Sequence, residues 1–164
     1  MKLPDESYLH SAARHTMAEW LRHGSVYDQY RTVFGLTWRV NRRAPLYGVL
    51  EECPIVFGVN ASPAHEGIDA PDEHELTDDE GLCLPYKTLL QTNRRPIAVL
   101  DVAIQHKGSI LHGIEITAKS PVSEQKWDTL CDLGLHVIEV SAEWVLSQVS
   151  VPSALRVLRE CHGN

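Results

Sequence analysis

Two runs of alternating apolar residues, at 97–105 and 110–118, lie close together in this chain of 164 residues. They read IAVLDVAIQ and ILHGIEITA, and Lys107–Gly108–Ser109 supplies a short polar turn between them. A two-residue period is typical of β-strands, and two strands joined by a short glycine-containing turn form an antiparallel hairpin. The sequence therefore predicts a hairpin around which the rest of the fold is built.

The apolar positions of the two runs set the expected register of this hairpin. Directly opposed residues of an antiparallel pair point to the same face, so the apolar sets merge only if even-numbered residues oppose even-numbered ones. The expected core face is then formed by Ala98, Leu100, Val102, Ile104, Ile110, Ile114 and Ile116. With a three-residue turn, Asp101 falls directly opposite Glu115, with their Cβ atoms about 4.5–5.5 Å apart.

Two opposed carboxylates repel each other, so this register requires a compensating positive charge. A divalent ion would provide it, and carboxylate oxygens suit Mg²⁺ or Mn²⁺. Lys119 lies on the same face of its strand as Glu115 and would also contribute. The alternative is a solvated charge cluster of little energetic value. A helix and a further strand are expected after the hairpin, which implies that the hairpin lies inside a sheet. Its charged face would then be covered instead of exposed to solvent.

Further helices and strands are predicted on both sides of the hairpin. A helix over 5–22 follows from cap residues before a helical apolar repeat, and β-branched and aromatic runs predict strands at 30–41 and 46–59. The remaining expected elements are a helix starting at Ser123, a strand at 136–140 and helices at 142–149 and 152–161. We expect an α/β fold in which a central mixed sheet, containing the antiparallel hairpin, is flanked by helices.

The length of the chain favours a single domain over residues 1–164. Residues 1–50 carry seven Lys and Arg against four Asp and Glu, residues 51–82 carry none against ten, and residues 83–164 carry eight of each. The net charge of −7 therefore resides in one segment. Its Pro, Gly and carboxylate content at about 60–82 predicts an acidic loop insertion.

No apolar run is long enough for a membrane helix, and the N-terminal residues lack the apolar stretch of a secretory signal. We therefore expect a cytoplasmic protein with no membrane partner. The four cysteines are scattered without a Cys-x-x-Cys pair, so we expect reduced, buried thiols.

In its N-terminal helix and in the hairpin that contains Asp101 and Glu115, the sequence resembles the PD-(D/E)xK nuclease superfamily, which has a restriction-endonuclease-like fold. More narrowly, it resembles the competence-protein (CoiA-like) branch of that superfamily. The N-terminal helix reads ESYLHSAARHTMAEWL, and the hairpin reads RRPIAVLDVAI followed by GIEITAKSPVSEQK. The resemblance covers most of residues 5–23 and 94–140. It implies that Asp101 and Glu115 bind the catalytic metal, Mg²⁺ or Mn²⁺.

The resemblance also calls for a lysine near the two acids. Thr117 stands where the family usually has Lys or Gln. Lys119 keeps the required face and is our expected catalytic lysine. Lys107, in the turn, and Lys126, on the helix after the hairpin, are the less favoured candidates.

The activity implied by the resemblance is metal-dependent hydrolysis of phosphodiester bonds in nucleic acid, with DNA as the expected substrate. A metal on Asp101 and Glu115 would polarise the phosphate and activate water. Glu51 or Glu52, on the preceding strand, would either add a further carboxylate or be an exposed strand residue. The residues expected to contact nucleic acid are His10, Arg14, Arg42, Arg43, Arg94 and Arg95, with Arg39 as a further positive charge.

Two other functions fit the same sequence. A catalytically inactive member of the fold would act as a binding or assembly module, with Thr117 marking the lost lysine. An acidic regulatory protein would dock on a basic partner through residues 60–82, whose charge would repel DNA. Domains of the restriction-endonuclease type often pair, so the resemblance is also compatible with a homodimer.

Overall fold

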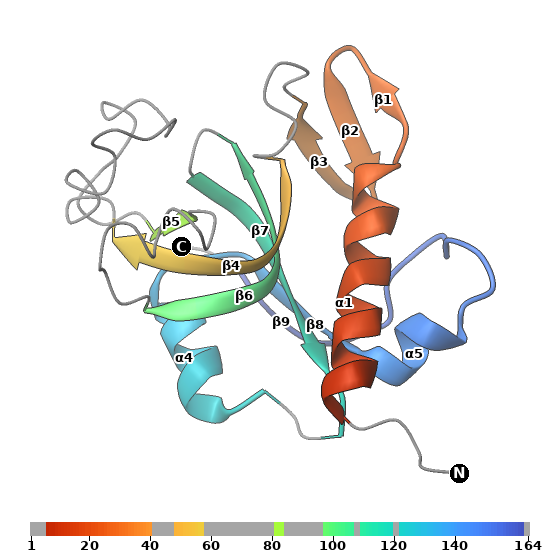
Figure 1. Cartoon of the computed structure of the whole chain (residues 1–164). Coiled ribbons are helices and arrows are strands. Elements are labelled where there is room, and N and C mark those ends of the chain that lie inside the picture. The colour runs from red at the N-terminus through yellow and green to blue at the C-terminus, as the bar shows by residue number, and fades with distance from the viewer. Residues whose placement is uncertain are drawn as a thin grey trace, which may run out of the picture.

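The computed structural model describes residues 6–40, 48–57, 81–83, 97–106, 109–119 and 122–162. The chain begins with a helix, α1 (Glu6–Arg22), and a small antiparallel sheet of three strands follows it (Figure 1). These strands are β1 (Val26–Tyr27), β2 (Tyr30–Val33) and β3 (Leu36–Arg39). The later elements are β4 (Val49–Phe57), β5 (Gly81–Cys83), β6 (Ala98–His106), β7 (Ser109–Thr117), α4 (Glu124–Asp132), β8 (Val137–Ser141), α5 (Ala142–Ser147) and β9 (Val157–Cys161).

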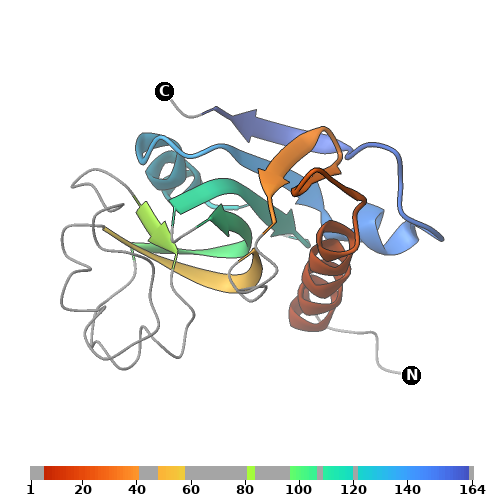
Figure 2. The ribbon, with the colours of Figure 1, turned by 90° about the horizontal axis from the view of Figure 1, so that it is seen from above.

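The central sheet has six strands in the order β5-β4-β6-β7-β8-β9. Neighbouring strands are antiparallel except β7 and β8, which are parallel because α4 connects them. Helices α1 and α5 pack together on one face, and α4 covers the other (Figures 1 and 2). The expectation of an α/β fold with a central mixed sheet and an antiparallel hairpin is therefore confirmed.

The region expected to form one strand at 30–41 is divided into a hairpin. Phe34 and Gly35 both have positive φ angles, +54° and +78°, and they connect Val33 to its partner Leu36. Positive φ at both central residues is the geometry of the two-residue turn that matches strand twist. Phenylalanine is an unusual residue in the left-handed region, which explains why the sequence pattern did not reveal this turn.

The hairpin of β6 and β7 keeps the register that the sequence predicts near the two acids. Val102 pairs with Ile114 and Ile104 with His112, which are even-with-even pairs. The turn differs, because Ser109 already belongs to β7, while Lys107 and Gly108 lie outside the described residues. A β-bulge between Ile104 and Gln105 makes up the difference, leaving Leu111 as the extra residue on β7.

The single core face expected for the hairpin is wrong. Val102 and Ile104 pack in the cluster under α1, whereas Leu100 and Ala98 belong to the cluster under α4. The side-chain alternation of β6 thus reverses at Asp101: even-numbered residues before it face α4, and those after it face α1. The reversal coincides with an interruption in the pairing of β4 and β6 at Asp101.

The helix expected over 152–161 is also absent. Residues 148–156 connect α5 to β9, which pairs antiparallel with β8. This pairing supplies hydrogen-bond partners to the backbone groups on the outer edge of β8, which would otherwise be exposed. β9 is itself the edge strand, so Val157 and Leu158 remain about half exposed, and the helical reading of these apolar residues fails.

Cys53 is disulfide-bonded, so the expectation that all four thiols are reduced is wrong; Cys131 and Cys161 are free.

The acidic insertion expected at 60–82 lies outside the described residues except for its last two, Gly81 and Leu82, which are in β5. Within the described part of the chain, no helix has the length and apolar character needed to cross a bilayer.

Candidate functional site

The two acids lie at a fork between β6 and β7. The pairing of these strands ends at Val102 and Ile114. Beyond that point β6 continues alongside β4, with Leu100 opposite Cys53, and β7 continues alongside β8. Asp101 and Glu115 are the first residues of the two diverging arms, so their side chains can meet where no strand ladder joins them.

A strained residue of β4 lies beside the fork. Glu52 has a φ of +48°, and the β4–β6 pairing is interrupted at Glu52 and Asp101 while it is regular on both sides. Before this point Glu51 faces α1, and after it Cys53 packs under α4. A left-handed non-glycine residue costs about 1–3 kcal/mol and persists only where the surrounding structure holds it. It accounts for the change of face in β4, opposite the point where the alternation of β6 also reverses.

Asp101 is buried and held in place from two sides. Its Oδ2 accepts a hydrogen bond of 2.7 Å from the backbone N–H of Ile116, which fastens the two arms of the fork together. The same atom lies 3.2 Å from Nε2 of His10 on α1. Burial raises the pKa of Asp101, but the hydrogen bonds from His10, Glu115 and Ile116 outweigh it and lower the pKa overall. Asp101 is therefore the ionised member of the pair.

Glu115 is more deeply buried, with 1% of its surface exposed. Its carboxyl group lies within hydrogen-bonding reach of Asp101. Burial, followed by the charge of Asp101, raises the pKa of Glu115 to about 9. At neutral pH the two carboxyl groups therefore hold one proton between them, and Glu115 is the protonated member. The expected contact between the two carboxyl groups is present in the structure.

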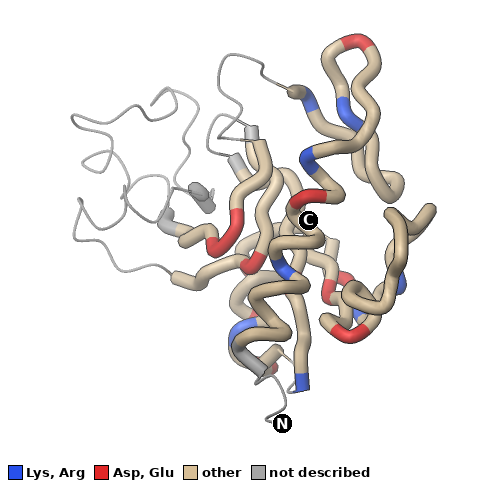
Figure 3. The backbone as a smooth tube through the Cα atoms, turned by 45° about the vertical axis from the view of Figure 1, so that its right-hand side comes forward, with Lys and Arg blue, Asp and Glu red and all other residues tan. Residues whose placement is uncertain are grey.

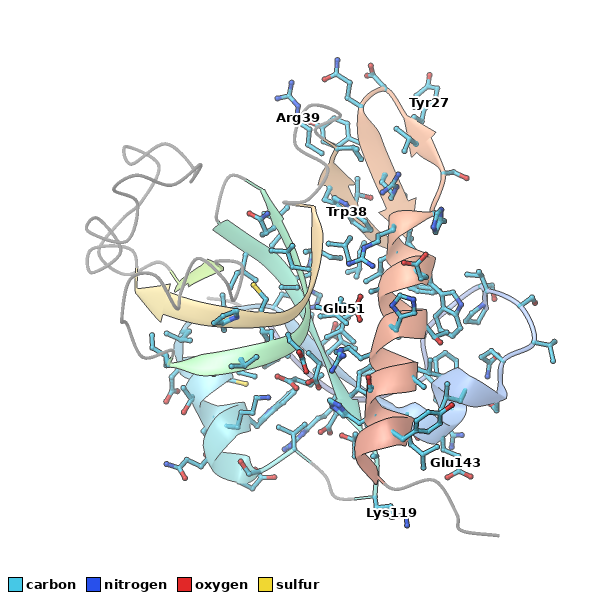
Figure 4. All side chains as sticks on the ribbon, in the orientation of Figure 1. Tyr27, Trp38, Arg39, Glu51, Lys119 and Glu143 are labelled. Atoms are coloured by element: carbon cyan, nitrogen blue, oxygen red, sulfur yellow. The ribbon has the colours of Figure 1, made fainter. Side chains whose placement is uncertain are left out.

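The lysine that contacts Glu115 is Lys126, from the first turn of α4. Its Nζ lies 3.0 Å from Oε1 and 3.1 Å from Oε2, and the contact with Oε2 is a hydrogen bond. Ser123 caps α4 by accepting a hydrogen bond from the backbone N–H of Lys126, which orients this first turn. Lys119 is exposed just beyond the end of β7, and its side chain points away from the fork (Figure 4).

Thr117 points to the same side of the sheet as Glu115, but it hydrogen-bonds to a different acid, Glu139. Its hydroxyl donates a 2.8 Å hydrogen bond to Oε2 of Glu139, a buried residue of β8. Oε1 of Glu139 accepts from Nε of Arg159 on β9 at 3.0 Å. The Arg159 guanidinium also lies over the Trp127 ring, 4.3 Å from its centroid. Glu139 is thus a neutralised structural acid rather than a free ligand.

Replacing Arg159 with methionine is expected to lower the free energy of unfolding by about 3 kcal/mol, because the carboxylate of Glu139 would remain buried without its cation. Arg156→Met is the matched control, since Arg156 is exposed on the preceding loop. Urea unfolding of both variants measures the difference. Equal stabilities would show that the ion pair of Glu139 and Arg159 contributes nothing.

The residues expected to contact nucleic acid are only partly brought to the fork. His10 reaches it and holds Asp101. Arg14, one helical turn further, instead binds β4, with Nη1 2.7 Å from Oε1 of Glu52 and Nε 3.4 Å from Oε1 of Glu51. Figure 3 shows these acidic positions of β4 alongside the basic positions of α1. The remaining expected residues, Arg42, Arg43, Arg94 and Arg95, lie outside the described residues.

The further carboxylate expected from β4 is also engaged. Oε2 of Glu51 lies 3.2 Å from Nη1 of Arg22 and 3.3 Å from Nδ1 of His15, in addition to its contact with Arg14. In Figure 4 Glu51 lies between β4 and α1. Two arginines and one histidine of α1 therefore surround Glu51, and these contacts attach α1 to the sheet. Arg39, at the tip of the small sheet, donates to the side chain of Gln29.

The fork offers the chemistry of a hard-metal site. Its two carboxyl groups are in contact, and both oxygens of Glu115 lie 3.0–3.1 Å from the Lys126 ammonium, so a positive charge already faces this site. Oxygen ligands from carboxylates match Mg²⁺ and Mn²⁺. Asp101 and Glu115 are therefore suitable ligands, and a cation would replace the proton that they now share.

Sequence reasoning found the two acids but selected a different lysine. The evidence for Lys126 was present, because the capping residue Ser123 fixes the phase of the helix. That phase puts Lys126 next to Trp127, which is buried. The contact between His10 and Asp101 had no local signal, since it joins a helix to a strand 91 positions later in the chain.

We compared the chain with models of protein families, with curated proteins and with solved structures, and no significant match was found.

Proposed function

We propose that this protein is a metal-dependent nuclease that hydrolyses phosphodiester bonds, with DNA as the expected substrate, and that Asp101, Glu115 and Lys126 form its active site. One observation carries the proposal: two carboxyl groups are buried in contact at the fork, with an ammonium group on one of them. Burying like charges together is costly, so such pairs are uncommon outside functional sites.

The surrounding residues support specific roles. The backbone N–H of Ile116 and the ring of His10 fix Asp101, which favours a rigid position for its carboxyl group. Lys126 places a positive charge at Glu115, where it would stabilise negative charge that develops on a phosphate during hydrolysis. A bound Mg²⁺ or Mn²⁺ would polarise the phosphate and lower the pKa of a coordinated water.

The order of elements supports a restriction-endonuclease-like fold as part of this proposal. A helix precedes three antiparallel strands, β4, β6 and β7, and the acids lie on the last two of them. This agrees with the helix and the acid-bearing hairpin that carry the sequence resemblance. The lysine comes from α4 instead of the strand position occupied by Thr117, so the absence of lysine at residue 117 does not favour an inactive module.

The test uses purified full-length protein with supercoiled plasmid, single-stranded DNA and RNA, each in Mn²⁺, Mg²⁺ or EDTA. We expect cleavage of at least one substrate with metal and none in EDTA. Cleavage that persists in Glu115→Ala would identify a contaminating nuclease. If the wild-type protein binds nucleic acid without cutting it, the proposal of catalysis fails and the binding module takes its place.

A further inference from the structure

A second group of metal-ligating side chains lies where β8 begins and β9 ends, on the sheet face opposite α4. Ile138 pairs with Glu160 in this antiparallel ladder, and His136 and His162 are the next residues on the same face. The two imidazole rings are stacked, with centroids 5.1 Å apart. Glu160 lies between them, because its Oε2 is 2.7 Å from Nε2 of His136 and its Oε1 is 3.3 Å from Nε2 of His162.

We propose that His136, Glu160 and His162 bind a divalent transition-metal ion of the zinc class, at a site separate from the fork of β6 and β7. One ligand atom from each of the three residues lies within 4.8 Å of the others. Ligand atoms at 2.0–2.1 Å from a tetrahedral zinc ion are about 3.3 Å apart. Only small side-chain movements are therefore needed to close the three atoms around an ion.

The ligand types select the metal class. Two imidazoles and one carboxylate form the ligand set of many zinc sites and of several iron sites, and they leave positions open for water or substrate. Mg²⁺ prefers oxygen ligands, so it would compete poorly here. The side chains of His136 and Glu160 are 18% and 32% exposed and that of His162 is 75% exposed, which gives an ion access from solvent.

A third histidine prepares His136 to act as a ligand. Nδ1 of His112, on β7, lies 2.8 Å from Nδ1 of His136, so one proton must lie between the two atoms. This contact, together with the approach of the His112 ring within 5.0 Å of the His136 ring, orients His136 so that its Nε2 faces Glu160.

The geometry at His136 leaves its second nitrogen directed at an acid. Nε2 of His136 faces the Glu160 carboxylate at 2.7 Å, so either a proton or a metal ion must lie between the two atoms. A second imidazole from His162 favours the metal ion.

Cobalt titration distinguishes the metal site from a simple ion pair between His136 and Glu160. With excess Mg²⁺ present, Co²⁺ should bind one site of the full-length protein and give the intense visible band of a four- or five-coordinate ion. Zinc should displace it. A thiolate-to-cobalt band in the near ultraviolet would instead show that free cysteines bind the ion and would overturn the proposal.

Three variants locate the site. His162→Ala removes an exposed ligand and should weaken Co²⁺ and Zn²⁺ binding at least about tenfold. His23→Ala is the matched control, because His23 is 76% exposed and lies 2.9 Å from the carboxylate of Glu19, but no second histidine completes that pair in the described residues. Asp101→Asn should leave cobalt binding unchanged, which separates this site from the fork. Equal affinities for His162→Ala and wild type would overturn the proposal.

Discussion

Replacing Lys126 with methionine is expected to lower metal-dependent cleavage about 10²–10³-fold, the range typical for removal of one charge-stabilising group. The same replacement of Lys119 should leave the cleavage rate close to that of the wild type. The reason is geometric, because the Lys126 ammonium lies 3.0 Å from Glu115, while Lys119 is exposed beyond the end of β7. Single-turnover cleavage of plasmid in Mn²⁺ measures both rates.

The pair of lysine variants separates a chemical role from a structural one. Because Glu115 holds a proton at neutral pH, loss of Lys126 does not leave an unpaired buried carboxylate. Thermal unfolding of Lys126→Met without metal should therefore remain within a few degrees of the wild type. Loss of cleavage in Lys119→Met, with activity kept in Lys126→Met, would contradict the assignment and support the lysine chosen from the sequence alone.

The hairpin could be predicted because its information is local. Alternation over 97–105 and 110–118 specified both strands and the register near Asp101, even though the turn is shorter than expected and a bulge at Leu111 restores the pairing. α1 and α4 were found for the same reason, since cap residues and apolar spacing mark their ends. These features depend on residues a few positions apart.

The sequence did not reveal features that depend on distant neighbours. β9 is a strand because β8 offers it an edge, and the apolar residues around Val157 are equally compatible with a helix. The reversal of side-chain alternation at Asp101 lies beside the left-handed backbone of Glu52, in another strand, so no pattern within residues 97–105 signals it. Register brought Asp101 and Glu115 together, whereas the choice between Lys119 and Lys126 required the packing of α4.

Replacing Glu115 with glutamine is expected to remove a large pH dependence of stability and, at the same time, metal binding. The pKa of Glu115 is raised from its ordinary value of 4.5 to about 9 in the folded protein. Between these values the unfolded chain releases the proton and the folded chain keeps it. The wild-type free energy of unfolding should therefore fall, relative to Glu115→Gln, as pH rises through this window, by up to about 1.4 kcal/mol per pH unit.

The comparison is best made between pH 6 and 8.5, above the lowered pKa of Asp101, so that this carboxylate stays ionised in both proteins. Urea unfolding in EDTA gives the two stability curves, and Glu143→Gln, which changes an exposed acid of α5, is the control (Figure 4). Parallel curves for wild type and Glu115→Gln would mean that Glu115 is ionised in the folded protein.

Mn²⁺ should counteract the fall in the wild-type free energy of unfolding at high pH, and it should not do so in Glu115→Gln. A metal ion binds the deprotonated carboxylate, so its binding releases a proton and strengthens as pH rises. Stabilisation by a fixed Mn²⁺ concentration should therefore increase from pH 6 to 8.5 in the wild type and be absent in Glu115→Gln. The glutamine variant keeps the size of the protonated acid, so it separates loss of the metal ligand from loss of packing. If both proteins gain equal stability from Mn²⁺, the ion binds elsewhere and the fork is not the metal site.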